Sequence, residues 1–177
     1  MNPDDFDAVF DTFHHAVFRL EALPAYDVGG ADAERMNAFL AGRALPERSV
    51  CTSPWLARMA VSTVVAGRRW ERVRVVDDPL TEYQAYELRA YQESQAVGER
   101  VLILPRTRAG NWGPDFWLFD TDTSNARAVL MDYAPDGRWL GVELVGDPKR
   151  VAVLADIRRE AMEAATPLNE FLAAVRA

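Results

Sequence analysis

Two arginines and one glutamate have a spacing that could build a polar site. If residues 69–76 (RWERVRVV) form a strand, alternation places Trp70, Arg72 and Arg74 on one face. In the helix predicted to follow, Glu87 interrupts an otherwise apolar face. An unpaired buried charge is costly, so we expect Glu87 to pair with Arg72 or Arg74.

Such a cluster has two interpretations. The first is a structural ion pair that only stabilises the fold. The second is a ligand pocket, because the carboxyl ends of parallel strands and the start of the next helix collect ligands in α/β sheets. For the pocket we expect a segment at 106–115 as a mobile flap and these candidate ligand-binding residues: Arg72, Arg74, Asp77, Asp78, Tyr83, Glu87, Arg106, Trp112 and Asp120.

The familiar catalytic and metal-binding patterns are absent from the sequence. His14 and His15 are adjacent, whereas two histidines chelating one metal from a helix need a spacing of four. Cys51 has no histidine near it in sequence, which favours a buried or loop thiol over a nucleophile. Phosphate-binding glycine loops and the HExxH and GxSxG motifs are missing. We therefore expect no catalytic residues, no metal and no cofactor.

The middle of the chain predicts the elements that would position the site. The β-branched segment 69–76, a long helix that ends at Gly98 and the apolar run RVLILP form a βαβ unit, whose strands should be parallel. Before it we expect a helix over 4–17, a short strand over 18–21, a helix over about 31–41 and another from Pro54 to Gly67.

After the βαβ unit, the stretch DFWLFD (115–120) predicts a strand covered on both faces, because neither side of it is polar. Two further strands, ARAVLMDY and WLGVELV, complete an antiparallel meander. The fold class expected is α/β, or α+β: a mixed sheet of five to six strands with helices on both faces, in a single domain over 1–177. Residues 166–177 should form a short amphipathic helix that packs on the domain or serves as a partner surface.

Composition limits the class of partner. The chain has 177 residues, 49% of them apolar, and a formal charge of −7, which argues against direct nucleic-acid binding. There is one cysteine, no basic leader and no apolar run long enough for a membrane span, so a cytoplasmic location without membrane contact is expected.

Several segments carry a resemblance to known proteins: FRLE with Tyr26, AFLAG, RRWERVRVVDDPLTEYQAYEL, GERVLILPR, DFWLFD and DGRWLGVELV. Over about residues 6–168 the chain resembles an uncharacterised actinobacterial domain family of unknown function. Members are often encoded beside helix-turn-helix regulators, so the resemblance implies a regulatory association. The element order is also similar to one half of the phospholipase D-like fold. That superfamily uses an HxK motif, which this sequence lacks, so the likeness implies a non-catalytic relative.

These observations favour a cytoplasmic, non-enzymatic binding or regulatory module. It would be the partner of a transcription regulator, a homodimer or a sensor of a small anionic ligand. The alternative is a hydrolase or transferase acting on a phosphoester or acyl substrate through Arg74, Glu87, Arg106 and Asp120, with glutamate as base and arginines as anion clamps. A third possibility is a protein that simply occludes another protein.

Overall fold

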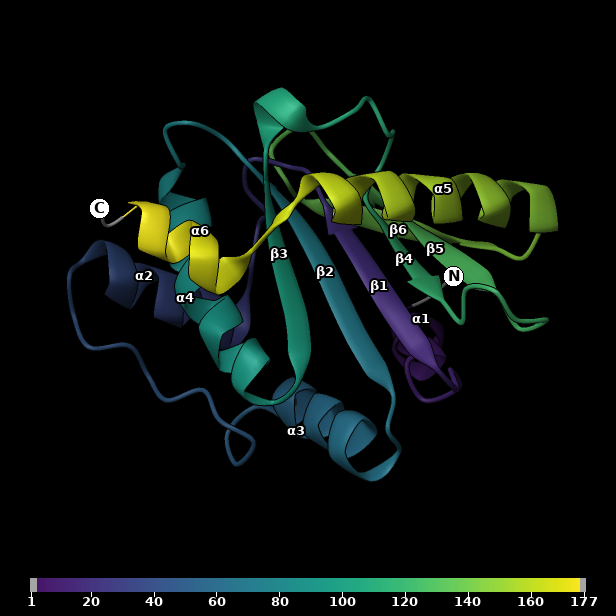
Figure 1. Cartoon of the computed structure of the whole chain (residues 1–177). Helices are drawn as coiled ribbons and strands as arrows, with labels where there is room; N and C mark the ends of the chain where they lie inside the picture. The colour runs from purple at the N-terminus through teal and green to yellow at the C-terminus, as the bar shows by residue number, and fades with distance from the viewer. Residues whose placement is uncertain (1–2, 176–177) are drawn as a thin grey trace.

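The computed structural model describes residues 3–175, which form one seven-stranded mixed sheet with helices on both faces (Figure 1). The strand order is β6-β5-β4-β1-β2-β3-β7. The strands are β1 (Ala16–Glu21), β2 (Arg69–Val76), β3 (Glu99–Pro105), β4 (Phe116–Phe119), β5 (Arg127–Tyr133), β6 (Trp139–Val145) and β7 (Thr166–Pro167). The helices are α1 (Pro3–Val9), α2 (Gly30–Leu40), α3 (Pro54–Ala60), which continues as a π-helical turn (Val61–Val65), α4 (Glu82–Ala96), α5 (Pro148–Ala164) and α6 (Leu168–Val175).

The βαβ unit predicted from the sequence is confirmed. β2 and β3 pair in parallel, with Arg72 opposite Val101, and α4 connects them. The start of α4 is fixed by a capping box, in which the Thr81 hydroxyl accepts from the Gln84 backbone N–H while the Gln84 side chain accepts from the Thr81 N–H. The structure adds a third parallel strand, because β1 pairs with β2 in the same direction.

The antiparallel meander β4-β5-β6 is also confirmed, and it extends the sheet from β1. The expected number of five to six strands was wrong by the short β7, whose two residues pair antiparallel with Leu102 and Ile103 of β3. The proline in β7 had indicated a helix start; it lies instead at the edge of the sheet, where a missing N–H is tolerated.

The N-terminal helix is shorter than the helix expected over 4–17, because α1 ends at Val9. The segment that follows is extended, since the carboxylate of Asp120 accepts the backbone N–H groups of His14, His15 and Ala16 at 2.7–3.2 Å. Three N–H groups bound in this way lead the chain directly into β1. The predicted strand over 18–21 is therefore correct in kind and begins two residues earlier, at Ala16.

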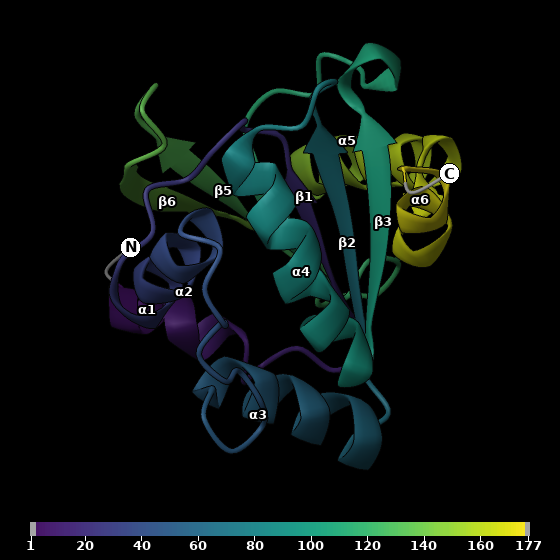
Figure 2. The ribbon, with the colours of Figure 1, turned by 90° about the vertical axis from the view of Figure 1, so that its left-hand side faces the viewer.

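The two faces of the sheet differ in what covers them. One face holds an apolar core packed mainly against α5, with Phe18, Val73, Leu102 and Leu118 among its buried residues. The other face is covered by α1, α2, α3 and α4 (Figure 2). The stretch DFWLFD is covered on both sides as predicted, because Phe116 and Leu118 join the first core while Trp117 and Phe119 join the second.

The C-terminal segment crosses the β3 edge of the sheet. α5 lies on one face, β7 pairs along β3, and α6 then packs its buried Leu168 with Val76, Leu88 and Ile103 on the other face. The amphipathic helix predicted over 166–177 thus spans Leu168–Val175 and packs on its own domain; residues 176 and 177 lie outside the described residues. None of the helices within 3–175 has the length and apolar character needed to traverse a bilayer.

Candidate functional site

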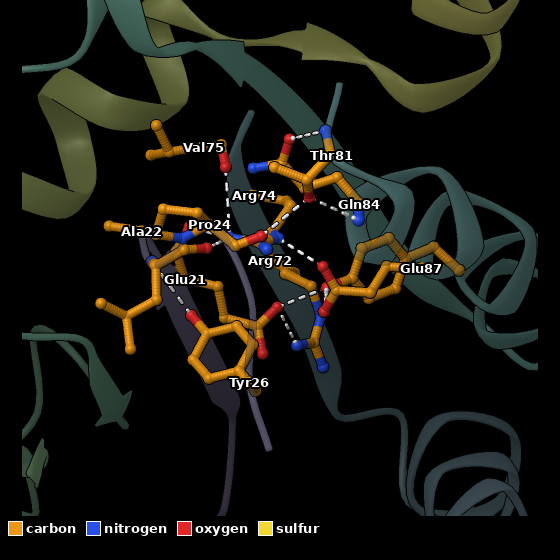
Figure 3. A network of polar contacts seen from close by, with 12 residues as sticks. Glu21, Ala22, Pro24, Tyr26, Arg72, Arg74, Val75, Thr81, Gln84 and Glu87 are labelled. Atoms are coloured by element: carbon orange, nitrogen blue, oxygen red, sulfur yellow. Dashed lines mark hydrogen bonds and ion pairs between the residues drawn. The ribbon is translucent and has the colours of Figure 1, made fainter. Parts of the chain in front are cut away.

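The charged residues of the second face form what we call the buried ionic network: Arg19, Glu21, Arg72, Arg74, Glu87, Glu99 and Asp115. Figure 3 shows its central part, with Glu21, Arg72, Arg74 and Glu87. All seven residues are at least nine-tenths buried. Strand alternation explains their grouping, because Arg19 and Glu21 of β1 lie in register with Arg72 and Arg74 of β2. Buried charges of this kind require partners, and each has at least one.

Arg72 is the centre of the network. Its Nη1 lies 2.6 Å from Glu21 Oε2 and its Nε 2.9 Å from Glu99 Oε1. Its guanidinium carbon also lies 5.1 Å from the centre of the Tyr91 ring, within the range of a cation–π contact. Burial opposes the charge of Arg72, but Glu21 and Glu99 outweigh it and raise the pKa well above its ordinary value.

Arg74 and Glu87 form the ion pair expected from the sequence. Arg74 Nε donates to Glu87 Oε2 at 2.7 Å, and Arg74 is completely buried. Its Nη1 donates to backbone carbonyl oxygens, the shortest contact being 2.6 Å to Leu23. These carbonyls satisfy part of the guanidinium independently of Glu87, so Arg74 stays positively charged whether or not Glu87 is ionised.

Tyr91 links two carboxylates. Its hydroxyl oxygen lies 2.5 Å from Glu21 Oε2 and 3.0 Å from Glu87 Oε1. One hydroxyl proton cannot serve both, so the arrangement is satisfied best when one carboxyl is protonated. Burial raises the pKa of Glu87 to about 7, whereas Arg72, Arg19 and Arg74 overcome burial and hold the pKa of Glu21 below its usual range. Glu87 is therefore the group that can hold the proton.

Arg19 connects the network to Asp115 at the start of β4. Arg19 Nη2 lies 3.4 Å from Asp115 Oδ2, and Asp115 Oδ1 accepts the backbone N–H of Ala22 at 2.8 Å. The hydroxyl of Tyr26 donates to the same carboxylate. This end of the network fixes the loop that follows β1 against the sheet.

Two adjoining cavities lie over the network, between the sheet, α2, α4 and the segment 41–53. The larger, about 380 Å³, is lined by Glu21, Ala31, Asp32, Arg35, Glu47, Arg48, Thr52, Ser53, Pro54, Trp55, Arg72 and Trp117. The smaller, about 130 Å³, shares Glu21, Asp32, Arg48, Trp55 and Arg72 with it and adds Val28, Tyr83, Tyr86, Glu87, Ala90, Tyr91 and Ser94. Together they have the size of a site for a small molecule.

The segment 41–53 is held over the larger cavity by two arginines. Arg35 of α2 donates to the carbonyl of Pro46 and lies 2.6 Å from Glu93 Oε1 through its Nη2. Arg48 donates to the carbonyl of Ala90 at 3.2 Å and lies 3.4 Å from the other oxygen of Glu93. One carboxylate of α4 thus serves two guanidinium groups, and Asp32 and Glu47 add two further carboxylates to the lining of the same cavity.

The structure brings together only part of the predicted site. Arg72, Tyr83 and Glu87 line the cavities, and Arg74 lies beneath them. Asp77 and Arg106 pair with each other at the carboxyl ends of β2 and β3, outside both cavities. There, Asp77 also accepts from the amide of Gln84 at 2.9 Å. Asp78 lines a separate apolar pocket next to α6.

The two remaining predicted site residues, Trp112 and Asp120, lie away from both cavities. The position of Trp112 also contradicts the expected flap over 106–115. Trp112 packs with the core on the α5 face, where its Nε1 donates to Glu160 at 3.2 Å. The segment 106–115 that carries it therefore does not cover the cavities. Asp120 follows Phe119, which pairs with Val17 near the start of β1, so it lies at the opposite end of the parallel strands from Asp77. It binds backbone N–H groups there.

Sequence reasoning missed the contribution of β1 and of the segment before α3. Arg19 and Glu21 alternate along FRLE as Arg72 and Arg74 do along β2, and that signal was available. Arg35, Arg48 and Trp55 carried no comparable signal, because α2 and the irregular segment 41–53 reach the site only through tertiary packing. Within the described residues there is no cluster of three or more His, Cys, Asp or Glu side chains suited to a metal, and Cys51 is exposed.

Comparison with known proteins identifies the family. A family model described as Domain of unknown function (DUF6879) matches residues 4–173. The chain belongs to this family. No curated protein matches the sequence. Because the match covers β1 through α6, the buried ionic network and both cavities lie inside the DUF6879 domain.

Proposed function

We propose that this DUF6879 domain is a non-enzymatic binding module that senses a small anionic ligand and acts in regulation. The observation that supports this is the larger cavity, where Arg35, Arg48 and Arg72 converge beside Trp55 and Trp117. Guanidinium groups are suited to bidentate recognition of carboxylates and phosphates, and aromatic walls provide apolar contact area. The buried ionic network supports the cavity from below and fixes Arg72 in one orientation.

The direct test is anion binding by the purified protein. Benzoate and inorganic phosphate are the probes, measured by calorimetry at low ionic strength. Arg48→Gln should weaken binding by about tenfold or more, since a charge-assisted hydrogen bond is lost. Arg43→Gln is the matched control, because Arg43 is an exposed residue of the same segment that does not line either cavity. Equal binding by both variants and the wild type would exclude the cavity as the anion site.

The regulatory part of the proposal concerns a protein partner. The resemblance to a family encoded beside helix-turn-helix regulators and the net charge of −7, which suits a basic partner, support it. The proposal includes a cytoplasmic location for the protein and a distant structural relationship to the phospholipase D-like fold. Affinity capture with the intact chain from its native host, read by mass spectrometry, tests it. Recovery of a helix-turn-helix protein is expected, and recovery of none, or only of the chain itself as a homodimer, would count against it.

Glu87 favours a second candidate, a hydrolase or transferase acting on a phosphoester or acyl substrate. Its carboxyl lines the smaller cavity, and burial raises its pKa to about 7, the range suited to a general acid or base. Hydrolysis of p-nitrophenyl acetate and of bis(p-nitrophenyl) phosphate should then titrate near pH 7 and be lost in Glu87→Gln. Equal rates for wild type and variant would remove this candidate.

A further inference from the structure

The cavity walls retain unused hydrogen-bond donors. Arg48 contacts the protein only through Nη1, and Arg72 uses Nε and Nη1, so Nε and Nη2 of Arg48 and Nη2 of Arg72 have no hydrogen-bond partner within 3–175. Arg35 is only 3% exposed, and its Nε is likewise unpartnered among the described residues. A buried guanidinium N–H without a partner is uncommon, and Arg35 Nε is one; the free nitrogens of Arg48 and Arg72 belong to side chains that line the same cavity.

The same cavity has one carboxylate that the protein does not use. Asp32 lines both cavities and makes no hydrogen bond or ion pair with the described residues. Asp32 is an exposed residue at the rim of the cavities, whereas the buried carboxylates beside them are engaged: Glu21 binds Arg19 and Arg72, and Glu87 binds Arg74 and Tyr91. Tyr86 adds a hydroxyl to the smaller cavity, close enough to Asp32 and Arg35 to interact with both.

The remaining wall is aromatic. Trp55 and Trp117 lie with ring centres 5.9 Å apart and nearly perpendicular, at 68°. Trp55 of α3 and Trp117 of β4 thus supply aromatic surface beside the polar groups. A ligand that uses the whole larger cavity must combine an anionic group, a cationic or donor group and a planar apolar part.

We propose that the cavity binds a free α-amino acid with a planar side chain. The arginines would hold its carboxylate, Asp32 its ammonium, and the tryptophans its ring. This inference rests on the proposed ligand-sensing function and names the class of ligand. A simple anion such as phosphate satisfies the arginines but places a second negative charge near Asp32, whereas a zwitterion offers each of them the opposite charge.

Three probes that share one ring separate the contributions. L-phenylalanine carries both charges, 3-phenylpropionate carries only the carboxylate, and phenethylamine carries only the ammonium. Calorimetry on the wild-type chain at pH 7 should show that phenylalanine binds about tenfold or more tightly than either analogue, the effect of one charge-assisted contact.

Substitutions assign each charge to its partner. Asp32→Asn should lower the affinity for phenylalanine to that for 3-phenylpropionate. Glu34→Gln is the control: Glu34 is exposed on the same helix, and its substitution should leave all three affinities unchanged. Arg48→Gln should weaken the binding of both carboxylate-bearing probes and leave the affinity for phenethylamine unchanged. Arg48 also anchors the segment 41–53, so a second variant, Arg48→Lys, is needed to separate binding from folding. Lysine keeps the positive charge but lacks the planar guanidinium group, so the affinity for phenylalanine should fall while Tm stays the same.

The outcomes distinguish this inference from the function on which it rests. Equal affinities for phenylalanine and 3-phenylpropionate, both lost in Arg48→Gln, would overturn the amino-acid proposal while an anion-sensing cavity stands. An unchanged phenylalanine affinity in Asp32→Asn would do the same. Failure of all three probes, together with failure of benzoate and phosphate, would overturn both.

Discussion

Glu21 and Glu87 show how position sets protonation inside one network. Both carboxylates are buried and share the Tyr91 hydroxyl, yet their pKa values shift in opposite directions. Glu21 lies among three guanidinium groups, which outweigh its burial. Glu87 has Arg74 alone and feels the charge of Glu21, so burial dominates and its pKa rises to about 7.

The raised pKa of Glu87 predicts a stability effect with a definite sign. Between the ordinary value of 4.5 and about 7, the folded chain binds the proton that the unfolded chain has lost, so stability falls as pH rises through this window. Glu87→Gln removes that titration. The stability of the wild type relative to Glu87→Gln should decline by on the order of 3 kcal/mol between pH 5 and pH 8, measured by urea unfolding.

Glu82→Gln is the matched control, since Glu82 is an exposed residue of the same helix. Its difference from the wild type should stay constant with pH. A Glu87→Gln difference that is equally flat would show that Glu87 is ionised throughout the window.

Asp120 gives a second prediction for a single residue. Burial tends to raise its pKa, but the N–H groups of His15, His14 and Ala16 lower it further than burial raises it. Asp120→Asn removes the charge from these hydrogen bonds and should cost about 2 kcal/mol at pH 7, measured by urea unfolding. Asparagine tolerates the positive φ of 50° at this position, so backbone strain does not account for the loss. The cost should diminish as pH falls through the lowered pKa of Asp120, because the wild-type carboxyl then becomes neutral as well.

At the scale of elements, local signals were sufficient where sequence neighbours decide the structure. The βαβ unit could be predicted because Thr81 and Gln84 cap α4 and because residues 69–76 alternate cleanly. α1 was overestimated because the apolar spacing of Phe13 and Val17 fits a helix as well as a buried turn and strand. The contact that decides it, with Asp120, comes from more than a hundred residues away in the sequence.

The candidate site was also predictable only where its residues are close in sequence. The pairing of Arg74 with Glu87 could be inferred, since both residues lie within the βαβ unit. The placement of Arg19, Arg35 and Arg48 could not, because it depends on β1 pairing with β2 and on how the segment 41–53 folds back over the sheet. Likewise Asp120 and Trp112 were assigned to the wrong places because the sequence does not reveal that β4 lies beside β1.

The contribution of α6 can be measured separately. Leu168 is fully buried between β3 and α4, so Leu168→Ala should lower the free energy of unfolding by about 2–5 kcal/mol in a urea titration. Val175→Ala, at a position 61% exposed on the same helix, should change it by less than about 0.5 kcal/mol. Similar small effects from both changes would mean that α6 is not docked in solution.

At the scale of the whole molecule, stability should pass through a maximum as pH changes. Lowered pKa values at Glu21, Asp77 and Asp120 mean that their contribution is present above their ordinary pKa values and lost as pH falls below them. Above pH 5, Glu87 acts in the opposite sense, and the growing negative charge of an acidic chain adds repulsion. We expect maximal Tm near about pH 5 in a scan from pH 3 to pH 8. A Tm that rises steadily to pH 8 would contradict this.

The pairing order of the sheet has a consequence for how the chain is made. β1 emerges from the ribosome before β2 and β4, the two strands with which it pairs, and the β3 edge is protected only when β7 has been synthesised. Until then, the nascent polypeptide exposes an arginine- and glutamate-bearing strand with its charges unmatched. Such non-local topologies fold slowly, so productive folding of this domain should wait until β7 has been synthesised and should be sensitive to chaperone supply during expression.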